Sequence, residues 1–308
     1  MSILVFSEDK EQAYQLLGKA SELADQMGGE VYSLVSDEPQ AYINQGANKV
    51  LQTILGDFTV EPYRAALLNA IEASGAETVL LGATKYGKEL APRIAAALGV
   101  GCMTDCNKID YVDGELVVER LTYGGSTIAK ETCTSKPTII SVSPRSFNKL
   151  EPTQRSGEVI QLSFDAPEAK VKVLERREKP KGDQDLENAD IIVSAGRGFK
   201  NKDDLKILTE LAEVLGGAAI GCTRPISADL GWMEEWVGIS GKKVKPSLYI
   251  TCGISGQIQH IAGIRDSKII VSINKDEGAG IHGVSDYSIV GDLYEVIPAL
   301  VKALREKA

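Results

Sequence analysis

Strand-like and helix-like segments alternate along the first hundred residues of this chain. Short apolar runs at 3–6, 30–35 and 78–82 predict buried strands. Between them, the apolar spacing of amphipathic helices recurs at 11–27, from Pro62 onward and at 87–98. Because parallel strands are joined by crossover connections, usually helices, this alternation favours a mainly parallel sheet with helices on both faces.

The pattern changes after residue 101 and restarts near residue 186. Strands are predicted at 115–119 and 137–142, whereas 144–188 has no periodicity and 175–185 is a mixed-charge run typical of a solvated connector. Beyond it we predict a helix at 203–215, a last helix at 293–307 capped by Asp292, and strands at 191–194, 218–221, 247–252, 268–273 and 287–290. We therefore predict two α/β domains with mainly parallel sheets and flanking helices, at 1–187 and 188–308.

Composition excludes several classes of protein. The chain has 308 residues, a length that suits two domains, and its apolar runs are too short to insert into a membrane. Its net charge of −9 argues against nucleic acid as a partner. Five cysteines without paired spacing and two histidines argue against a metal site, so we expect no metal and reduced, mostly buried thiols. With no targeting segment after Met1, we expect a cytoplasmic protein.

Small and polar residues follow all five predicted strands of the C-terminal domain. Since ligands of open parallel sheets bind at the carboxyl ends of strands, these joins predict a large ligand that carries phosphate. No nucleophile with a base, paired carboxylates or metal cluster accompanies them, so we predict no catalytic residue. The joins are at 194–198, 221–225, 252–260, 273–276 and 290–292.

Three features of these joins carry the chemistry. The loop Gly253–Gly256 opens a predicted helix, where free amides and the helix dipole favour an anion, although the same pattern fits a structural turn. His260 lies in that helix near Ile258 and Ile261, which we expect to face the core, and a lone histidine there can equally be structural. Arg197 and Arg224 fit contacts with phosphate or an aromatic ring, or are solvated surface charges.

One long motif resembles a known family. The stretch 248–263, LYITCGISGQIQHIAG, followed by INKD at 273–276, strongly resembles the alpha subunit of electron transfer flavoproteins. Four further segments are similar to family segments: SAGRG at 194–198, VGISGK at 237–242 to VGQTGK, DYSIVGDL at 286–293 to DYGIVGDL, and ERLTYGG at 119–125 to RPIYAG. The resemblance covers essentially the whole chain.

The resemblance implies a Rossmann-like C-terminal domain that binds FAD and an N-terminal domain that pairs with a beta subunit. It implies an electron carrier between flavin-containing dehydrogenases and a quinone- or ferredoxin-linked acceptor. In the electron-bifurcating branch of the family, the electrons come from NADH and the complex is a catalytic oxidoreductase. The sequence does not distinguish that branch from the simple carriers.

Site residues are carried over by position. The resemblance implies that Arg224 lies against the flavin ring, that the Ser240 hydroxyl bonds to flavin N5, and that His260 lies near flavin O2. Either Arg224 or His260 could then supply a charge-assisted hydrogen bond. Residues 255–259 match the pyrophosphate turn, and Asp292 with Leu293 the adenosine side. The expected cofactor-binding residues are Arg197, Thr223, Arg224, Val237, Gly238, Ile239, Ser240, Ser255, Gly256, Gln257, Ile258, Gln259, His260, Asn274, Asp292 and Leu293.

Two departures from the family and two alternatives remain. The family's Gln-Thr is Ile239-Ser240 here, and IHGVS at 281–285 replaces IFQVA, which introduces His282; we interpret it as a surface histidine. A nicotinamide-dependent oxidoreductase would need a GxGxxG turn, which the sequence lacks. A nucleotide-binding sensor built on the first domain is a third hypothesis, although that half has no glycine-rich phosphate loop.

Overall fold

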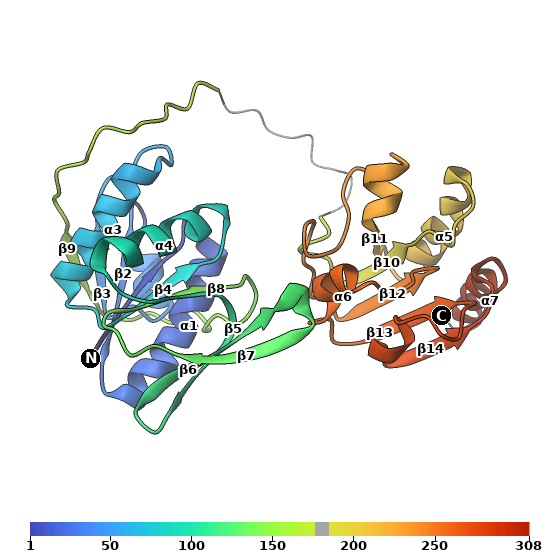
Figure 1. The fold of residues 1–308 in the computed structure, drawn as a ribbon, viewed down its shortest axis with the longest axis horizontal. Helices are drawn as coiled ribbons and strands as arrows, with labels where there is room; N and C mark the ends of the chain where they lie inside the picture. The colour runs from blue at the N-terminus through green and yellow to red at the C-terminus, as the bar shows by residue number, and fades with distance from the viewer. Residues whose placement is uncertain (176–184, 308) are drawn as a thin grey trace. The chain divides into compact units, whose positions relative to one another are not determined.

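The computed structural model describes residues 1–175 and 185–307, which form two compact units (Figure 1). The first unit comprises residues 1–122 and 128–175, and the second comprises 123–127 and 185–307. Most of the charged run predicted as a connector, at 176–184, lies outside the described residues.

The first unit is built on a nine-stranded sheet in the order β7-β6-β5-β8-β4-β1-β2-β3-β9. The pairs from β5–β8 across to β3–β9 are parallel, while β5 and β6 pair antiparallel. Its strands are β1 (Ser2–Phe6), β2 (Glu30–Val35), β3 (Lys49–Gln52), β4 (Thr78–Gly82), β5 (Cys102–Val112), β6 (Glu115–Thr122), β7 (Thr127–Thr132), β8 (Thr138–Val142) and β9 (Glu158–Gln161).

Helices cover both faces of this sheet. The helices are α1 (Lys10–Met27), α2 (Pro39–Asn44), α3 (Val60–Ser74) and α4 (Lys85–Leu98). Residues of α1 and α2 pack on one face and those of α3 and α4 on the other, with fully buried aliphatic side chains between the layers. Asp9 caps α1 by accepting a hydrogen bond from Gln12 N at 2.9 Å, and Gly28 ends it in the left-handed conformation.

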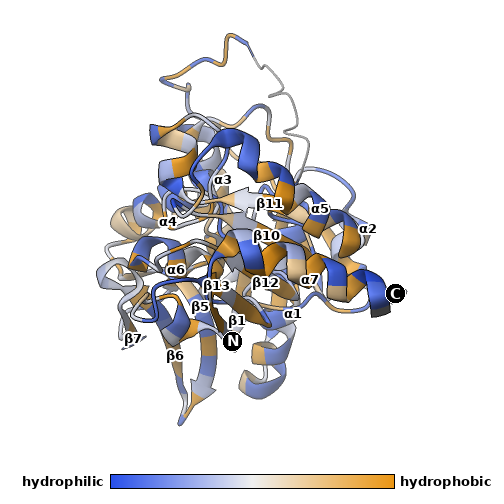
Figure 2. Cartoon of the chain, turned by 90° about the vertical axis from the view of Figure 1, so that its right-hand side faces the viewer, coloured by the Kyte–Doolittle hydropathy of each residue, from blue (hydrophilic) through white to orange (hydrophobic). Residues whose placement is uncertain are grey.

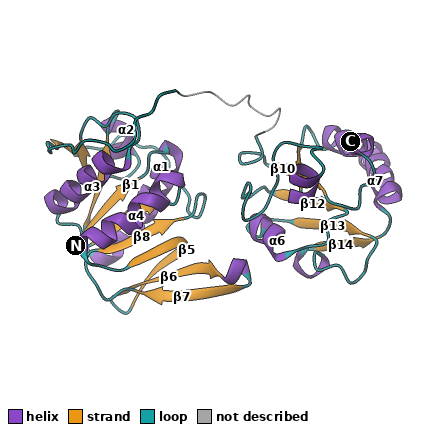
Figure 3. Ribbon diagram, turned by 45° about the horizontal axis from the view of Figure 1, so that its top comes forward, coloured by secondary structure: helices purple, strands orange, loops and turns teal. Residues whose placement is uncertain are grey.

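The second unit has a five-stranded sheet in the order β11-β10-β12-β13-β14, with every pair parallel (Figure 3). Helices α5 and α7 cover one face, and α6 with the strand-to-helix loops covers the other. The helices carry both hydrophilic and hydrophobic residues (Figure 2). The elements are β10 (Ile191–Ala195), α5 (Lys206–Val214), β11 (Ala219–Cys222), β12 (Leu248–Cys252), α6 (Ile258–Ile264), β13 (Ile270–Asn274), β14 (Tyr287–Val290) and α7 (Leu293–Lys307), with short helical turns at Tyr123–Gly125, Lys202–Leu205, Pro225–Asp229 and His282–Val284.

The predicted α/β fold with two mainly parallel sheets is confirmed. The prediction of an irregular segment at 144–188 is wrong at one point, because β9 adds to the free edge of the first sheet by pairing with β3. Leu186 is 4% exposed and packs in the core of the second unit. We infer that the C-terminal domain begins before this residue, upstream of position 188.

In the parts of the chain that the structure describes, no helix is long and apolar enough to cross a membrane. All five cysteines are free thiols, and Cys106, Cys222 and Cys252 are buried. Burial raises the pKa of each of these three thiols to about 12, so they stay protonated at neutral pH.

Candidate site at the carboxyl ends of the second sheet

The five predicted joins meet at one edge of the second sheet. All five strands run parallel, so the loops that follow them share the carboxyl edge. The chain passes from β10 to β11 on one side and returns with β12 on the other side of β10. The strand order therefore reverses between β10 and β12, the position where ligands of open α/β sheets bind.

The loops after β10 and β12 cross with their backbones in contact. Gly196 N donates to Cys252 O at 2.9 Å, and Gly198 N donates to Gly253 O at 3.0 Å. A Cβ on Gly196 would lie 2.3 Å from Gly253 O, a distance no side chain tolerates. Gly253 itself has φ of 66°, in the left-handed region that favours glycine. The glycines are therefore needed to bring the two loops together at the point where the strand order reverses.

The predicted phosphate loop rests on the segment after β13. Ile281 N donates to Ser255 O at 3.2 Å, and Asn274 Nδ2 donates to Ile254 O at 2.8 Å. Gly256 has φ of 83°, and a Cβ there would lie 2.1 Å from Ile281 N. Ser255 and Gln257 are exposed, so the loop presents polar groups outward on a supported backbone.

The loop at 237–240 lies against α6. Ile239 N donates to Gln259 O at 2.8 Å, which joins this loop to the residues that follow the phosphate loop. Ile239 and Ser240 are exposed, and Val237 is buried. The structure thus brings the predicted N5-side residues and the predicted pyrophosphate residues into one continuous surface.

His260 is buried, at 6% exposure. Its Nδ1 lies 3.0 Å from Val237 O and its Nε2 lies 3.4 Å from the Tyr249 hydroxyl. Because a carbonyl only accepts, Nδ1 carries the proton in the neutral ring and Nε2 is left as an acceptor. Burial lowers the pKa of His260 to about 4, opposed by its hydrogen bond to Val237, so the imidazole is neutral at pH 7. A charge-assisted hydrogen bond from His260 to a ligand would therefore require the ring to take up a proton on binding.

The expected orientation of the helix around His260 is wrong. Ile258 is 49% exposed, although it was predicted to face the core. The helix α6 has only seven residues, and its inward positions are His260, Gly263 and Ile264. The imidazole takes the inward position because Val237 O and Tyr249 satisfy its nitrogens there.

Three polar residues at the edge are available for a ligand. Arg197 and Arg224 are exposed, and within the described residues neither forms an ion pair. Thr223 is 9% exposed, and its buried Oγ1 has no hydrogen-bond partner in the described parts of the chain. A buried hydroxyl without a partner and two guanidinium groups without an ion pair in the described residues, all on loops at this edge, fit an anionic, hydrogen-bonding ligand.

At the other side of the edge, Asp292 and Leu293 begin α7. Asp292 Oδ1 accepts from Tyr294 N at 2.9 Å, which confirms the predicted cap. Leu293 is buried, and its Cδ2 lies so close to Gly253 that a Cβ on that glycine would be only 2.7 Å away. The α7 terminus is therefore packed directly on the glycine crossing.

Two hydrogen-bond partners of the histidines were not predicted from the sequence. They are Tyr249, which contacts His260, and Ser272, which contacts His282. Both are in strands that otherwise read as apolar, and both are fully buried. Ser194, Thr251, Ser272 and Ser288 are paired in register across four strands. Hydroxyls at matching positions of neighbouring apolar strands are the signal that could have revealed this polar layer.

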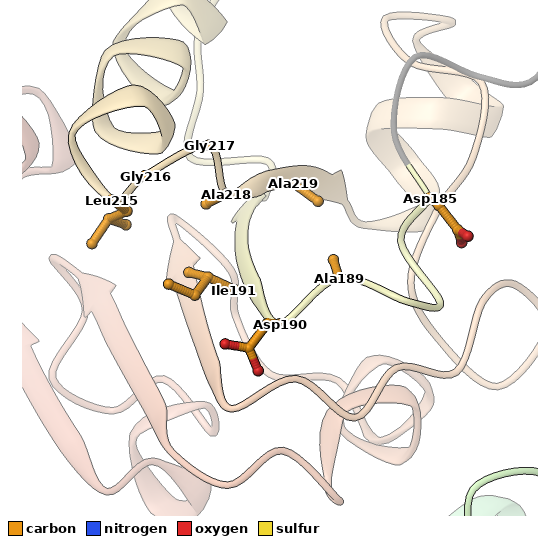
Figure 4. Close-up of a pocket in the computed structure, with 9 residues that line it drawn as sticks. All are labelled: Asp185, Ala189, Asp190, Ile191, Leu215, Gly216, Gly217, Ala218 and Ala219. Carbon is orange, nitrogen blue, oxygen red and sulfur yellow. The ribbon is translucent and has the colours of Figure 1, made fainter.

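A pocket of about 440 Å³ lies at the opposite edge of the second sheet (Figure 4). It is lined at the amino ends of β10 and β11 by Asp190, Ile191 and residues 215–219, together with Asp185 and Ala189. Figure 4 shows two carboxylates and otherwise aliphatic or glycine residues around it. It contains none of the predicted site residues and offers no cation for a phosphate.

The sheet of the first unit also has a point of reversal, between β1 and β4. The space there is filled by Gln12, which is 4% exposed and whose Nε2 donates to Val142 O at 2.7 Å. A Cβ on Gly82, at the end of β4, would lie 2.7 Å from the Gln12 amide. This filled crevice does not favour a nucleotide site in the first unit.

The fold and the site together define a two-unit α/β protein with a binding edge for a phosphate-bearing cofactor on its second sheet. Residues 4–167 match the electron transfer flavoprotein domain, and residues 185–265 match the electron transfer flavoprotein FAD-binding domain. The chain belongs to the electron transfer flavoprotein alpha-subunit family.

Similar proteins align with this chain over most of their length. The chain is 38% identical to an electron transfer flavoprotein subunit alpha of Thermoanaerobacterium thermosaccharolyticum, over 96% of this chain and 93% of the relative. It is 36% identical to the protein FixB of Clostridium saccharobutylicum, over 99% of this chain and 96% of the relative. It is 38% identical to an electron transfer flavoprotein subunit alpha of Bacillus subtilis, over 87% of this chain and 83% of the relative. The cofactor of the second domain is FAD.

Proposed function

We propose that this chain is the alpha subunit of a cytoplasmic, heterodimeric electron transfer flavoprotein. In this proposal the first domain pairs with a beta subunit. The second domain holds FAD and exchanges electrons with flavin-containing dehydrogenases and with a quinone- or ferredoxin-linked acceptor. The observation that carries the proposal is the convergence of all five glycine- and polar-rich loops at the carboxyl edge of the second sheet.

The residues of that edge suit the parts of FAD that the family assigns to them. The loop at 255–257, in which Ser255 and Gln257 are exposed, is suited to the pyrophosphate, since backbone amides bind phosphate oxygens. Arg197, which forms no ion pair within the described residues, could bind a phosphate oxygen from its own loop. Asp292 at the start of α7 would lie on the adenosine side. Arg224, Ser240 and the buried hydroxyl of Thr223 would lie along the flavin ring. FAD, when bound, supplies reversible one- and two-electron chemistry, and the protein sets its potential.

His260 can interact with the flavin ring in two ways, which depend on its protonation. With Nδ1–H held by Val237 O, Nε2 can donate to flavin O2 only if the imidazole takes up a second proton. A neutral His260 would instead offer Nε2 as an acceptor. Negative charge that develops next to a buried imidazole favours its protonated form, so we expect His260 to hold a proton when the cofactor is reduced.

A redox titration of the complex tests this proposal. The two subunits are expressed together, and the visible spectrum is recorded during stepwise reduction. We expect His260→Ala to lower the one-electron potential by about 65–130 mV, because only the protonated ring can donate to flavin O2 and the lost hydrogen bond is then charge-assisted. An unchanged potential contradicts the role of His260. FAD content separates the two branches of the family, because a bifurcating complex holds a second FAD.

A further inference from the structure

His282 lies at the start of the helical turn His282–Val284, beside β13 and β14. Its Nδ1 is 2.8 Å from Ser272 Oγ, and that hydroxyl donates to Ser288 Oγ at 3.2 Å. Ser272 is fully buried on β13 and is paired in register with Ser288 on β14. The expectation of a surface histidine is therefore wrong, since this imidazole is bonded into the sheet.

The imidazole of His282 is held at this position by its hydrogen bond to Ser272 rather than by apolar packing. Because the Ser272 hydroxyl donates to Ser288, it accepts from Nδ1–H, and Nε2 is then a buried acceptor without a partner in the described residues. A buried ring nitrogen of this kind is costly, so packing alone would favour an apolar residue. The family stretches similar to these segments have Phe where this chain has His282 and Gly where it has Ser288. Neither residue can form these bonds.

The residues directly before His282 support the phosphate loop. Ile281 N donates to Ser255 O at 3.2 Å, and Gly256 is in backbone contact with Ile281. His282 N donates to Ala279 O at 3.0 Å, so the turn is closed on both sides of Ile281. A movement of His282 away from Ser272 would therefore move the backbone on which Ser255 and Gly256 rest.

We propose that His282 is a positioning residue of the FAD site, acting through Ser272 to hold the loop Gly253–Gln257 in its binding conformation. The inference rests on the assignment of this loop to the FAD phosphates. His282 does not contact the cofactor in this account. Its hydrogen bond lowers the ordering cost that the loop would otherwise meet when FAD binds.

Three substitutions separate the hydrogen bond from the shape of the side chain. His282→Asn keeps a polar atom near the Nδ1 position, His282→Gln places one near the Nε2 position, and His282→Phe restores the family residue without any polar atom. We expect the Phe and Gln variants to bind FAD about three- to tenfold more weakly, the range expected for one lost hydrogen bond. The Asn variant should stay within about twofold of the wild type.

The measurements are FAD affinity of the heterodimer and hydrogen exchange of the amides at 253–257 in the heterodimer stripped of FAD. Exchange at this loop should be faster in the Phe and Gln variants and unchanged in the Asn variant. Ser247→Ala is the matched control. It removes a serine hydrogen bond of 2.6 Å to Asp190 at the opposite edge of the same sheet, and it should change neither measurement.

The inference is overturned if the Phe variant matches the wild type in both measurements, or if the Asn variant is as weak as the Phe variant. A heterodimer that binds no FAD would instead contradict the proposed function. Loop exchange in the stripped protein would still decide the role of His282 in that case.

Discussion

At the scale of single residues, the buried His260 has the most unusual environment in the site. An imidazole with 6% exposure is largely taken out of water, and Val237 O and the Tyr249 hydroxyl are its hydrogen-bond partners. A carbonyl and a hydroxyl stabilise a neutral ring but do not compensate a positive charge. His260 is therefore a neutral structural group without FAD, and the proposed function requires it to take up a proton before it can donate a hydrogen bond to the flavin.

The depressed pKa of His260 predicts a pH dependence of stability in the FAD-free protein. Between pH 6.5 and 4 the unfolded chain binds a proton at His260 that the folded chain does not bind. The free energy of unfolding should therefore fall as the pH falls through this window, by about 3 kcal/mol in total. Urea unfolding at several pH values measures this change.

His260→Gln is the comparison for that experiment, since glutamine does not titrate and retains a polar side chain. Carboxylates titrate in both proteins, so the difference between the two pH profiles isolates the histidine. Parallel profiles from pH 7 to 4 would show that His260 is accessible to protons in the folded state, against the buried geometry described above.

At the scale of elements, the site depends on loops that approach more closely than side chains allow. We predict that Gly253→Ala destabilises the second domain by about 2 kcal/mol or more, because the position combines a left-handed φ with contact to Gly198 and Leu293. FAD content should fall with it. Thermal unfolding and flavin absorbance per protein measure the two effects.

Gly283→Ala is the matched control for that substitution. Gly283 lies in the same domain and has no left-handed φ, and a Cβ at this position would meet no atom of the described residues within 4 Å. It should keep wild-type stability and FAD content. If Gly253→Ala behaves like this control, the crossing of the loops after β10 and β12 is not what holds the site.

The sequence was sufficient to predict elements with strong local signals. The strands and helices with clear apolar periodicity, and the cap at Asp292, are confirmed. The edge strand β9 was missed because its burial pattern is mostly exposed and its pairing with β3 joins residues more than a hundred positions apart. The inward face of α6 was misassigned because Tyr249 and Val237, which lie outside the helix, decide where the imidazole of His260 points.

In the site itself, the sequence predicted the shared edge but not its polar interior. Parallel strands force all five joins to one side, so the convergence follows from topology alone. The bond between His282 and Ser272 depends on how the turn His282–Val284 folds back against β13, which the apolar periodicity does not reveal. The family resemblance supplied expected roles, whereas the geometry supplied the partners of each group.

At the scale of the whole molecule, the two units show different binding potential at equivalent places. Each sheet has a point where the strand order reverses, and in the first unit Gln12 fills it. In the second unit, the loops at this edge carry glycines, two arginines and the Thr223 hydroxyl, and within the described residues the arginines form no ion pair and the hydroxyl has no partner. This contrast supports FAD binding in the second domain rather than in the first.

The most direct test of this account is an experimental structure of the complex purified with its beta subunit and FAD. We predict electron density for FAD across the carboxyl ends of β10 and β12, with the phosphates at 255–257 and the flavin ring beside Arg224 and His260. FAD density at the amino-edge pocket around Asp190, or none on this chain, would contradict the account.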